Sequence, residues 1–357
     1  MEKVIVGMSG GVDSAVAASI LIEKGFNVEG LFMKNWEDNS EFCTAEQDYK
    51  DALQVCDKLN IPLRSVNFSK QYWDRVFKDF LNEHKKGRTP NPDILCNTEI
   101  KFKEFYKYAL NLGADRIATG HYAQNQFIDN HTKLLKGKDS TKDQSYFLYG
   151  LNQKQITNSI FPIGNLNKKD VRYHAKKLGF TNANKKDSVG ICFIGERNMK
   201  KFLSKYLPRN PGNIITTNGT NMGSHEGLMY YTIGQRRGLG IGGRNNKQKG
   251  AWYVAGKDME NNELIVVQGH EHPALYHRKI IGSNLNWISG LKPIQQDLNA
   301  KIRYRSKDKP CKIKILENNK ISVKFHEPRF AITPGQSIVF YEKNVCLGGA
   351  VIDSYKN

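Results

Sequence analysis

Residues 3–24 read KVIVGMSGGVDSAVAASILIEK, and this stretch decides the fold. The apolar run Lys3–Met8 predicts a buried strand, and the pattern from Ala15 to Lys24 predicts a helix. The segment between them, Ser9–Ser14, consists mainly of glycine and small polar residues. Glycines let a backbone turn tightly and aim its N–H groups at an anion, and the following helix adds the positive end of its dipole. The stretch therefore predicts a strand, a phosphate-binding loop and a helix.

Two interpretations of the loop remain open at this stage. Asp13 or Ser14 can cap the helix, which is a purely structural role. The flanking strand and helix favour the phosphate-binding interpretation, because they supply the context in which such a loop acts. A Walker loop ends in Gly-Lys followed by Ser or Thr, and no lysine follows these glycines. Kinases and GTPases are therefore disfavoured.

The alternation of strand and helix continues beyond the loop. Further strands are expected at Asn27–Met33 and Leu63–Phe68, on either side of a helix at Ala45–Leu59, and a longer helical region leads to Arg116–Ala123. This rhythm predicts a doubly wound α/β domain over residues 1–200, with a parallel sheet covered by helices on both faces. Ligands of such sheets bind beyond the carboxyl ends of the strands.

The character of the sequence changes after about residue 200. Asn, Gly and Thr separate short apolar runs and helical patterns become scarce, which predicts a small central domain over residues 201–273. From Tyr276 onward apolar and polar residues alternate, as in Ile321–Phe325, next to a turn at Asn318–Asn319. We therefore expect an antiparallel β-barrel over residues 274–357.

Composition indicates the kind of partner. The chain has 357 residues and 39% apolar content, enough for two or three domains with a core each. Lys and Arg number 54 against 35 Asp and Glu, and the net charge of +19 favours a nucleic-acid partner. A basic protein with merely solvated lysines is the alternative. The sequence shows no run of 18 apolar residues and no signal peptide, so we expect a cytoplasmic protein without a membrane partner.

The six cysteines are scattered, as expected in a reducing compartment, and no CxxC pair favours zinc or an iron–sulfur cluster. We therefore expect no metal bound by the protein itself. Cys96 lies in NPDILCN (residues 91–97), three residues after Asp93. A helix beginning near Asp93 would lower the pKa of the Cys96 thiol through the positive end of its dipole. Cys192 lies between glycines in SVGICFIG (residues 188–195), which suits a mobile thiol. The remaining cysteines are expected to be small buried apolar residues, namely Cys43, Cys56, Cys311 and Cys346.

The glycine loop resembles the pyrophosphate loop of the N-type ATP pyrophosphatases, which split ATP into AMP and pyrophosphate while adenylating an oxygen. Combined with NPDILCN and GICFIG, it is similar over essentially the whole chain to the tRNA-specific 2-thiouridylases. The other segments that fit this family are TGHYA (residues 119–123), KDQSYFL (142–148), TIGQRRG (232–238) and RYR (303–305).

The resemblance implies a mechanism and an ATP site. ATP, accompanied by Mg²⁺, would adenylate the C2 oxygen of the wobble uridine, and Cys192, loaded as a persulfide by a sulfur-carrier protein, would deliver sulfur. Cys96 would release sulfide or resolve the persulfide as a disulfide with Cys192, and Asp93 would be the general acid or base. The implied ATP contacts are Gly7, Met8, Ser9, Gly10, Gly11, Val12, Asp13, Ser14, Met33 and Gly120. For Met33 the core alternative stays open, because a methionine that ends a buried strand is usually a core residue.

The resemblance also implies contacts with the anticodon region of tRNA. These fall on Asn91, Pro92, Asp93, His121, Lys142, Asp143, Gln144, Arg303, Tyr304 and Gln336. Structural alternatives stay open for several of them. His121 can be a satisfied core histidine, Lys142 and Asp143 a solvated ion pair, and Arg303 part of a solvated sheet face.

Two other functions compete with this hypothesis. One is a ligase of the same superfamily that adenylates a small molecule and attacks it with ammonia, which would need neither a cysteine pair nor a basic barrel. The other is an RNA-binding protein that retains the loop without catalysis. Pyrophosphate release that depends on tRNA would separate the three.

Overall fold

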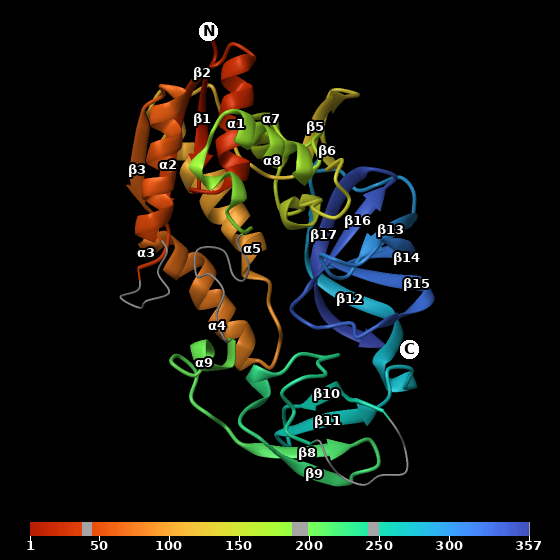
Figure 1. Ribbon diagram of the computed structural model, residues 1–357. Helices are drawn as coiled ribbons and strands as arrows, with labels where there is room; N and C mark the ends of the chain where they lie inside the picture. Colours follow the sequence, from red (N-terminus) through yellow and green to blue (C-terminus); the bar gives the residue numbers. More distant parts are fainter. Residues whose placement is uncertain (38–44, 188–198, 242–249, 357) are drawn as a thin grey trace.

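The computed structural model describes residues 1–37, 45–187, 199–241 and 250–356. Figure 1 shows three parts: a parallel sheet with helices at the start of the chain, a small sheet of β8–β11, and a barrel at the end. Cys43 and Cys192 lie outside the described residues, so the predictions for these two thiols rest on sequence. No helix in the described part combines the length and apolar character that a membrane span requires.

The first part is built on a five-stranded parallel sheet with the order β3-β2-β1-β4-β7. The order runs outward from β1 in both directions, so the connections that leave β1 and β4 diverge between these two strands. Such a point is where α/β sheets bind ligands. The strands are β1 (Lys3–Met8), β2 (Asn27–Lys34), β3 (Leu63–Asn67), β4 (Arg116–Ala118) and β7 (Ser159–Ile160).

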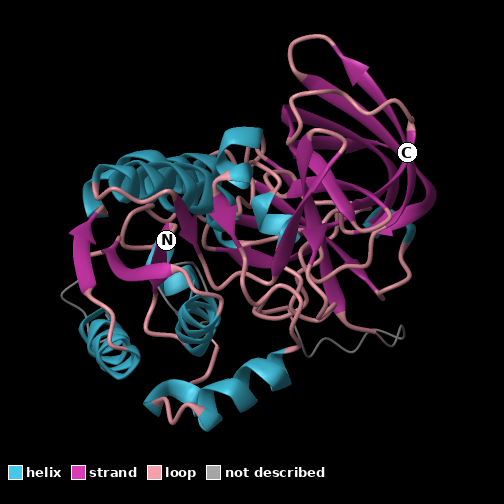
Figure 2. Ribbon diagram, turned by 90° about the horizontal axis from the view of Figure 1, so that it is seen from above, coloured by secondary structure: helices cyan, strands magenta, loops and turns pink. Residues whose placement is uncertain are grey.

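Helices cover both faces of this sheet, as expected of a doubly wound fold (Figure 2). Alternate residues of β1 explain why: Val4 and Val6 pack into one apolar cluster and Ile5 into another. The first face is covered by α1 (Val12–Glu23), α2 (Ala45–Leu59) and α8 (Lys168–Lys177). The second is covered by α3 (Ser69–Tyr72), η1 (Trp73–Phe77), α4 (Lys78–Lys85), α5 (Pro92–Leu95), η2 (Cys96–Glu104) and α6 (Phe105–Asn111).

The central part is a four-stranded sheet with the order β10-β11-β8-β9, closed over a core that includes Ile214, Val254 and Leu264. Its strands are β8 (Gly212–Thr216), β9 (Asn221–His225), β10 (Trp252–Asp258) and β11 (Glu263–Gln268).

The remaining short helices are distributed along the described chain. They are η3 (Ser145–Leu148), α7 (Gln153–Thr157), η4 (Thr181–Asn184), α9 (Met199–Leu203), η5 (Leu228–Tyr230) and η6 (Pro273–Leu275).

The last part is the expected antiparallel barrel. Its six strands follow the order β12-β15-β14-β13-β16-β17 and close through the pairing of β12 with β17. Ile313 and Val323 point into its core, and Asn318 and Asn319 both adopt a φ of 55°, which confirms the predicted turn. The strands are β12 (Tyr276–Trp287), β13 (Asp297–Lys301), β14 (Lys309–Leu316), β15 (Lys320–Phe330), β16 (Ser337–Glu342) and β17 (Val345–Lys356).

The expectation of one continuous strand over Arg116–Ala123 is wrong. Strand β4 ends at Ala118, and Ala123 begins a hairpin of β5 (Ala123–Ile128) and β6 (His131–Lys136). Strand β6 then pairs with β17, so the hairpin extends the barrel sheet. Leu134, which faces Cys346 across this pairing, is fully buried, and this burial explains why the hairpin leaves the parallel sheet.

Candidate active site

The glycine loop closes on itself between β1 and α1. The hydroxyl of Ser14 accepts a hydrogen bond from the Ser9 N–H at 3.2 Å and donates one to the Gly11 carbonyl at 3.1 Å. Gly10 has a φ of +71°, and a Cβ added there would lie 2.3 Å from the backbone oxygen of Asp48. Only glycine fits both conditions. Helix α1 begins at Val12 rather than at Ala15, so its free N–H groups lie directly after the loop.

Three of the predicted ATP-site residues converge on this loop. A Cβ at Gly120 would lie 2.7 Å from the Asp13 carbonyl carbon and the Ser14 nitrogen, so the chain after β4 passes directly against the start of α1. A Cβ at Gly7 would lie 3.4 Å from the end of the Met33 side chain. Met33 also belongs to the core, and both interpretations made for it are compatible with this position. Contact of these residues with ATP stays a prediction.

A network of cations and carboxylates borders the loop on one side. Lys168 Nζ lies 2.7 and 2.8 Å from the two carboxylate oxygens of Asp13 and 2.8 Å from Asp187. Asp187 also binds Lys142 at 2.5 Å and Arg172 at 3.1 Å. Burial raises the pKa of Asp187, but hydrogen bonds from Lys142 and Lys168 outweigh it and lower the pKa to about 2. Three cations are therefore held beside the loop by carboxylates.

Lys185 contacts the loop at Gly10. Its ammonium group donates to the Gly10 carbonyl at 3.3 Å and forms ion pairs with Asp48 and Asp51. Burial lowers the pKa of Lys185, but hydrogen bonds to the two carboxylates outweigh it, so the pKa is raised. Asn182 donates a second hydrogen bond to the Gly10 carbonyl at 3.1 Å. Cations thus contact the loop at both Gly10 and Asp13, an arrangement that suits a multiply charged phosphate.

Sequence reasoning missed Lys168, Arg172, Lys185 and Asp187. These residues lie more than 150 positions after the loop, and a lysine or aspartate carries no local sign of a distant partner. One signal was available. Asn167 and Asp170 form a capping box, and this pattern marks the start of α8, where Lys168 is the first helical residue.

The NPDILCN segment is anchored at the start of α5. The side chain of Asn91 caps the helix by accepting a hydrogen bond from the Asp93 N–H at 3.1 Å, and the helix begins at Pro92. Cys96 is fully buried and is the fifth helical residue. The expected helix start near Asp93 is confirmed to within one residue. The helix dipole acts more strongly on Asp93 than on Cys96, because its effect falls off after the first turn.

The same segment meets the predicted KDQSYFL motif. Asn97 Nδ2 donates to the Phe147 carbonyl at 3.1 Å, and the Phe147 ring lies 4.4 Å from that of Tyr304, which belongs to the RYR motif. The Tyr304 hydroxyl donates in turn to the Lys142 carbonyl at 3.3 Å. Three motifs that are far apart in the sequence therefore lie together beside Cys96.

His121 occupies the position of a core histidine. It is 8% exposed, its Nδ1 lies 2.8 Å from the Thr119 hydroxyl, and its ring packs near Phe102 and Phe161. Burial, with a further contribution from Lys101, holds the pKa of His121 well below its usual value, so the ring is neutral. Contact of this residue with RNA stays a prediction.

Lys142 and Asp143 do not pair with one another. Lys142 binds Asp187, whereas Asp143 is buried and pairs with Lys301 of the barrel at 3.0 Å. The side-chain oxygen of Gln144 accepts a hydrogen bond from the Tyr122 N–H at 2.9 Å. The alternative of a solvated pair is therefore wrong, and the segment is fixed at both ends.

Two further RNA candidates join separate parts of the chain. Arg303 Nη2 donates to the Ile233 carbonyl of the central part at 3.0 Å and to the Ala331 carbonyl of the barrel at 2.8 Å. Gln336 Nε2 donates to the Thr89 carbonyl at 2.7 Å, just before NPDILCN. Arg303 is thus not part of a merely solvated sheet face. Gln336 therefore holds the chain just before the Cys96 segment, and Arg303 joins the central part to the barrel. Contact of both residues with RNA stays a prediction.

No group of three or more His, Cys, Asp or Glu residues suited to a metal ion occurs within the described ranges. Around the loop the acidic side chains Asp13, Asp48 and Asp187 are each paired with a lysine. The described residues of this site therefore fit a phosphate group better than a bare cation.

Comparison with known proteins gives consistent matches along the chain. Family models match as a tRNA methyl transferase HUP domain (residues 2–196), a tRNA methyl transferase PRC-barrel domain (200–268) and an aminomethyltransferase beta-barrel domain (277–352). The chain is 57% identical over 354 residues to the tRNA-specific 2-thiouridylase MnmA of Nitrosomonas eutropha, which covers 98% of each chain. It is 55% identical over 354 residues to the protein of the same name from Alkaliphilus oremlandii, covering 98% of this chain and 97% of the relative.

Among solved structures, a 4-thiouridine synthetase in complex with RNA and bound ATP matches with a TM-score of 0.37 and 21% identity. The match covers 58% of this chain and 50% of that one. A TM-score this low has no bearing on activity.

Proposed function

Because the chain belongs to the tRNA-specific 2-thiouridylase family, we propose that it exchanges the C2 oxygen of the wobble uridine of tRNA for sulfur at the expense of ATP. The protein is accordingly a tRNA-uridine 2-sulfurtransferase. The observation that carries the proposal is the glycine loop at the divergence point of the sheet, with Lys168 held at Asp13 and Lys185 held at Gly10. This arrangement suits release of pyrophosphate, and it lacks the Walker lysine that γ-phosphate transfer uses.

The first step activates a poor leaving group. The C2 oxygen of the uracil attacks the α-phosphorus of ATP, an O–P bond forms, and the bond to pyrophosphate breaks. Negative charge then develops on pyrophosphate, where the N–H groups of the loop and the ammonium groups of Lys168 and Lys185 can stabilise it. Mg²⁺ bound to ATP would neutralise further charge. Asp13 holds Lys168 with two short contacts before ATP arrives, so the cation is already oriented.

The second step transfers sulfur. The terminal sulfur of a persulfide on Cys192 attacks C2, and AMP leaves with the original oxygen. The Cys96 thiolate can then attack the inner sulfur of Cys192, which forms a Cys96–Cys192 disulfide and leaves sulfur on C2. Cys96 can alternatively release the persulfide sulfur as sulfide, which attacks C2 itself. In both routes a dithiol reductant restores the disulfide to thiols.

The burial of Cys96 supports a reaction that excludes water. Its thiol is fully buried, and water must be kept from an adenylated base because it would hydrolyse it. Asp93 lies one turn before Cys96 at the start of α5, where a carboxyl group can act as general acid or base toward the uracil ring. We place the reaction in the cytoplasm, because its thiols must be reduced between cycles, and we propose a sulfur-carrier protein as the source of the persulfide.

The test uses purified protein, ATP, an unmodified tRNA and a sulfur source. We expect pyrophosphate release that depends on tRNA, and 2-thiouridine in the nucleoside digest by mass spectrometry. Cys192→Ser should abolish thiolation while tRNA-dependent AMP formation remains measurable, because adenylation precedes sulfur delivery. Cys56→Ala serves as the control, because this buried thiol packs between α2 and the sheet and should be dispensable. Pyrophosphate release that ignores tRNA would favour the small-molecule ligase, and normal thiolation by the Cys96→Ala/Cys192→Ala variant would contradict the mechanism.

A further inference from the structure

Four lysines stand in register across four neighbouring strands of the barrel. Strand β12 pairs Lys279 with Lys356 of β17 on one side and with Lys324 of β15 on the other. Lys324 in turn lies opposite Lys312 of β14. All four side chains are exposed, because alternate residues of these strands point outward while their neighbours, such as Val323, fill the barrel. We refer to Lys279, Lys312, Lys324 and Lys356 as the lysine row.

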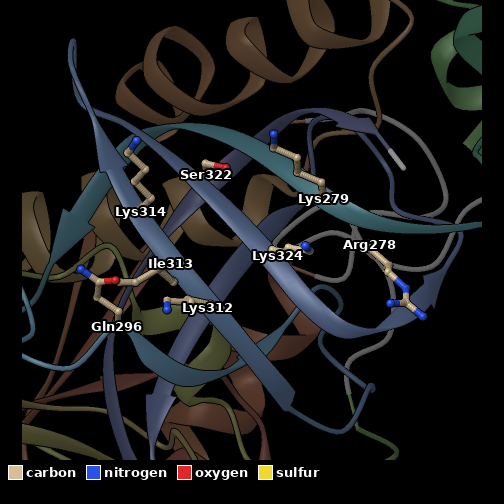
Figure 3. Close-up of a pocket in the computed structure, with 8 residues that line it drawn as sticks. All are labelled: Arg278, Lys279, Gln296, Lys312, Ile313, Lys314, Ser322 and Lys324. Atoms are coloured by element: carbon tan, nitrogen blue, oxygen red, sulfur yellow. The ribbon is translucent and has the colours of Figure 1, made fainter.

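Most of the lysine row borders an open groove of about 770 Å³ on the outside of the barrel (Figure 3). Figure 3 shows Lys279, Lys324 and Lys312 on three successive strands, with Arg278 and Lys314 close by. Gln296, Ile313 and Ser322 complete the described lining, so none of these lining residues is acidic or aromatic. The described lining is therefore strongly cationic and offers no aromatic ring on which a base or sugar could stack.

This arrangement opposes folding. Neighbouring strands lie about 4.8 Å apart, and like charges directly opposite one another destabilise a sheet. Within the described ranges none of the four lysines forms an ion pair, and Asp297, opposite Lys312, is the single acid in register with the row. Other lysines of the same sheet are treated differently: Lys301 pairs with Asp143, and Lys136 pairs with Asp308. An external polyanion that binds to the row would neutralise its charge and so offset this cost in folding free energy.

We propose that the lysine row binds the sugar–phosphate backbone of the substrate tRNA at a distance from the target uridine. The inference rests on the proposed function, because it takes tRNA as the polyanion. Cations repeated from strand to strand suit repeated phosphates, which position an RNA without reading its bases. Asp297 is the one acid in register with the row, and the described groove lining holds no aromatic residue. A membrane surface fits less well, because Ile313, the one apolar residue of the described lining, is buried and cannot insert into lipid.

The principal test compares two variants of equal charge. One carries Lys279→Gln, Lys312→Gln and Lys324→Gln, and the control carries Lys24→Gln, Lys177→Gln and Lys343→Gln, three exposed lysines that do not line the groove. The affinity for an unmodified tRNA is measured over a range of KCl concentrations. Each lost phosphate contact should lower the slope of log affinity against log salt by about 0.9, so the row variant should lose roughly 2 to 3 and the control less than 1. Equal slopes for the two variants would overturn the proposal.

A single reversal of charge separates binding from folding. Lys324→Glu places a carboxylate between Lys279 and Lys312, so the melting temperature should stay equal or rise while tRNA affinity falls at least tenfold. A fall in the melting temperature together with unchanged tRNA affinity would show that the row serves the fold. Binding to vesicles of equal parts phosphatidylcholine and phosphatidylglycerol forms a further arm. Loss of vesicle binding with unchanged tRNA affinity would overturn the proposal in favour of a membrane.

The readouts also separate this inference from the proposed function. At saturating tRNA, the row variant should form AMP at the wild-type rate with a raised KM for tRNA, because the row lies on strands remote from the glycine loop (Figure 1). If the wild type thiolates tRNA and the row and control variants bind tRNA equally, the proposed role of the lysine row is wrong and the proposed function stands. If the wild type shows no tRNA-dependent chemistry but the row variant has a smaller slope of log affinity against log salt, the proposed function is wrong and the role of the lysine row stands.

Discussion

Two cationic regions of this molecule are built in opposite ways. Beside the glycine loop, Lys168 and Lys185 are each held by carboxylates, whereas the lysine row on the barrel has no ion pairs among the described residues. The difference teaches what each kind of anion requires. A small, highly charged ligand needs cations that are fixed in place before it arrives, and ion pairs fix them. A long polyanion needs unneutralised charge that acts over a distance.

The two regions also have opposite effects on the fold. Ion pairs at the loop connect α1, α8 and the segment around Asp187, so they stabilise the site that they orient. The lysine row brings like charges together on adjacent strands and works against its own sheet. Removing charge should therefore destabilise the first region and leave the second equally or more stable.

The largest effect is expected at Lys168. Lys168→Ala removes an oriented cation from the loop, and tRNA-dependent AMP formation should fall roughly 10²- to 10³-fold, as for loss of one stabilising donor. Lys169→Ala is the matched control, since Lys169 is exposed on the next position of the same helix. Pyrophosphate release reports both variants. Equal rates for the two would show that the paired cations do not act on the phosphates.

A second effect is expected from the shape of the loop. Gly10 and Gly113 share a positive φ (+71° and +76°), but only at Gly10 would a Cβ collide with a backbone, that of Asp48. Gly113→Ala should cost about 1 kcal/mol from its φ alone. Gly10→Ala should cost about 1 to 3 kcal/mol more, because Asp48 and its ion pair with Lys185 must move. Urea unfolding measures the loss of stability in each variant, and titration with an ATP analogue measures the effect on nucleotide binding. Equal losses of stability in the two variants would remove the steric argument.

A smaller effect concerns pH. Asp187 has a pKa of about 2 in the folded protein against an ordinary value of 3.8, so its ion pairs contribute stability above pH 4. That contribution is lost as the pH falls from 4 to 2, because the unfolded chain takes up the proton first. Asp187→Asn should cost about 1 to 2 kcal/mol at pH 7, with allowance for solvent screening, and almost nothing at pH 2.

Unfolding curves of wild type and Asp187→Asn at several pH values test this expectation, with Asp57→Asn as the exposed control. A difference between wild type and variant that does not change with pH would mean that Asp187 stabilises the site by packing rather than by charge. The ion pairs beside the loop would then add no stability to that region, and the contrast with the lysine row would be weaker.

Local features of the fold were predictable from the sequence. Strand β1 and helix α2 have the expected bounds, and the Asn318–Asn319 turn has the expected positive φ values. The burial of Cys56, Cys311 and Cys346 was also expected. These properties depend on residues a few positions apart: an apolar period sets a strand or helix, and a pair of asparagines tolerates the left-handed region.

The partners of charged residues were not predictable. Asp143 was interpreted beside its neighbour Lys142, but it pairs with Lys301, and Lys168 was not singled out although it holds Asp13. The β5–β6 hairpin was likewise missed because its burial depends on β17, more than 200 residues later. Ion pairs and sheet edges have no sequence period, so nothing near these residues in the chain indicates the partner.

By itself, then, the sequence determined a glycine loop between a strand and a helix, a parallel sheet and a terminal barrel, because backbone sterics and the alternation of apolar residues act over short stretches of chain. Only the tertiary structure decided that Lys168 and Lys185 contact the loop and that four lysines share one row of the barrel. The register of distant strands and helices sets the distances between charges, and those distances decide which charges are neutralised and which stay available to a ligand.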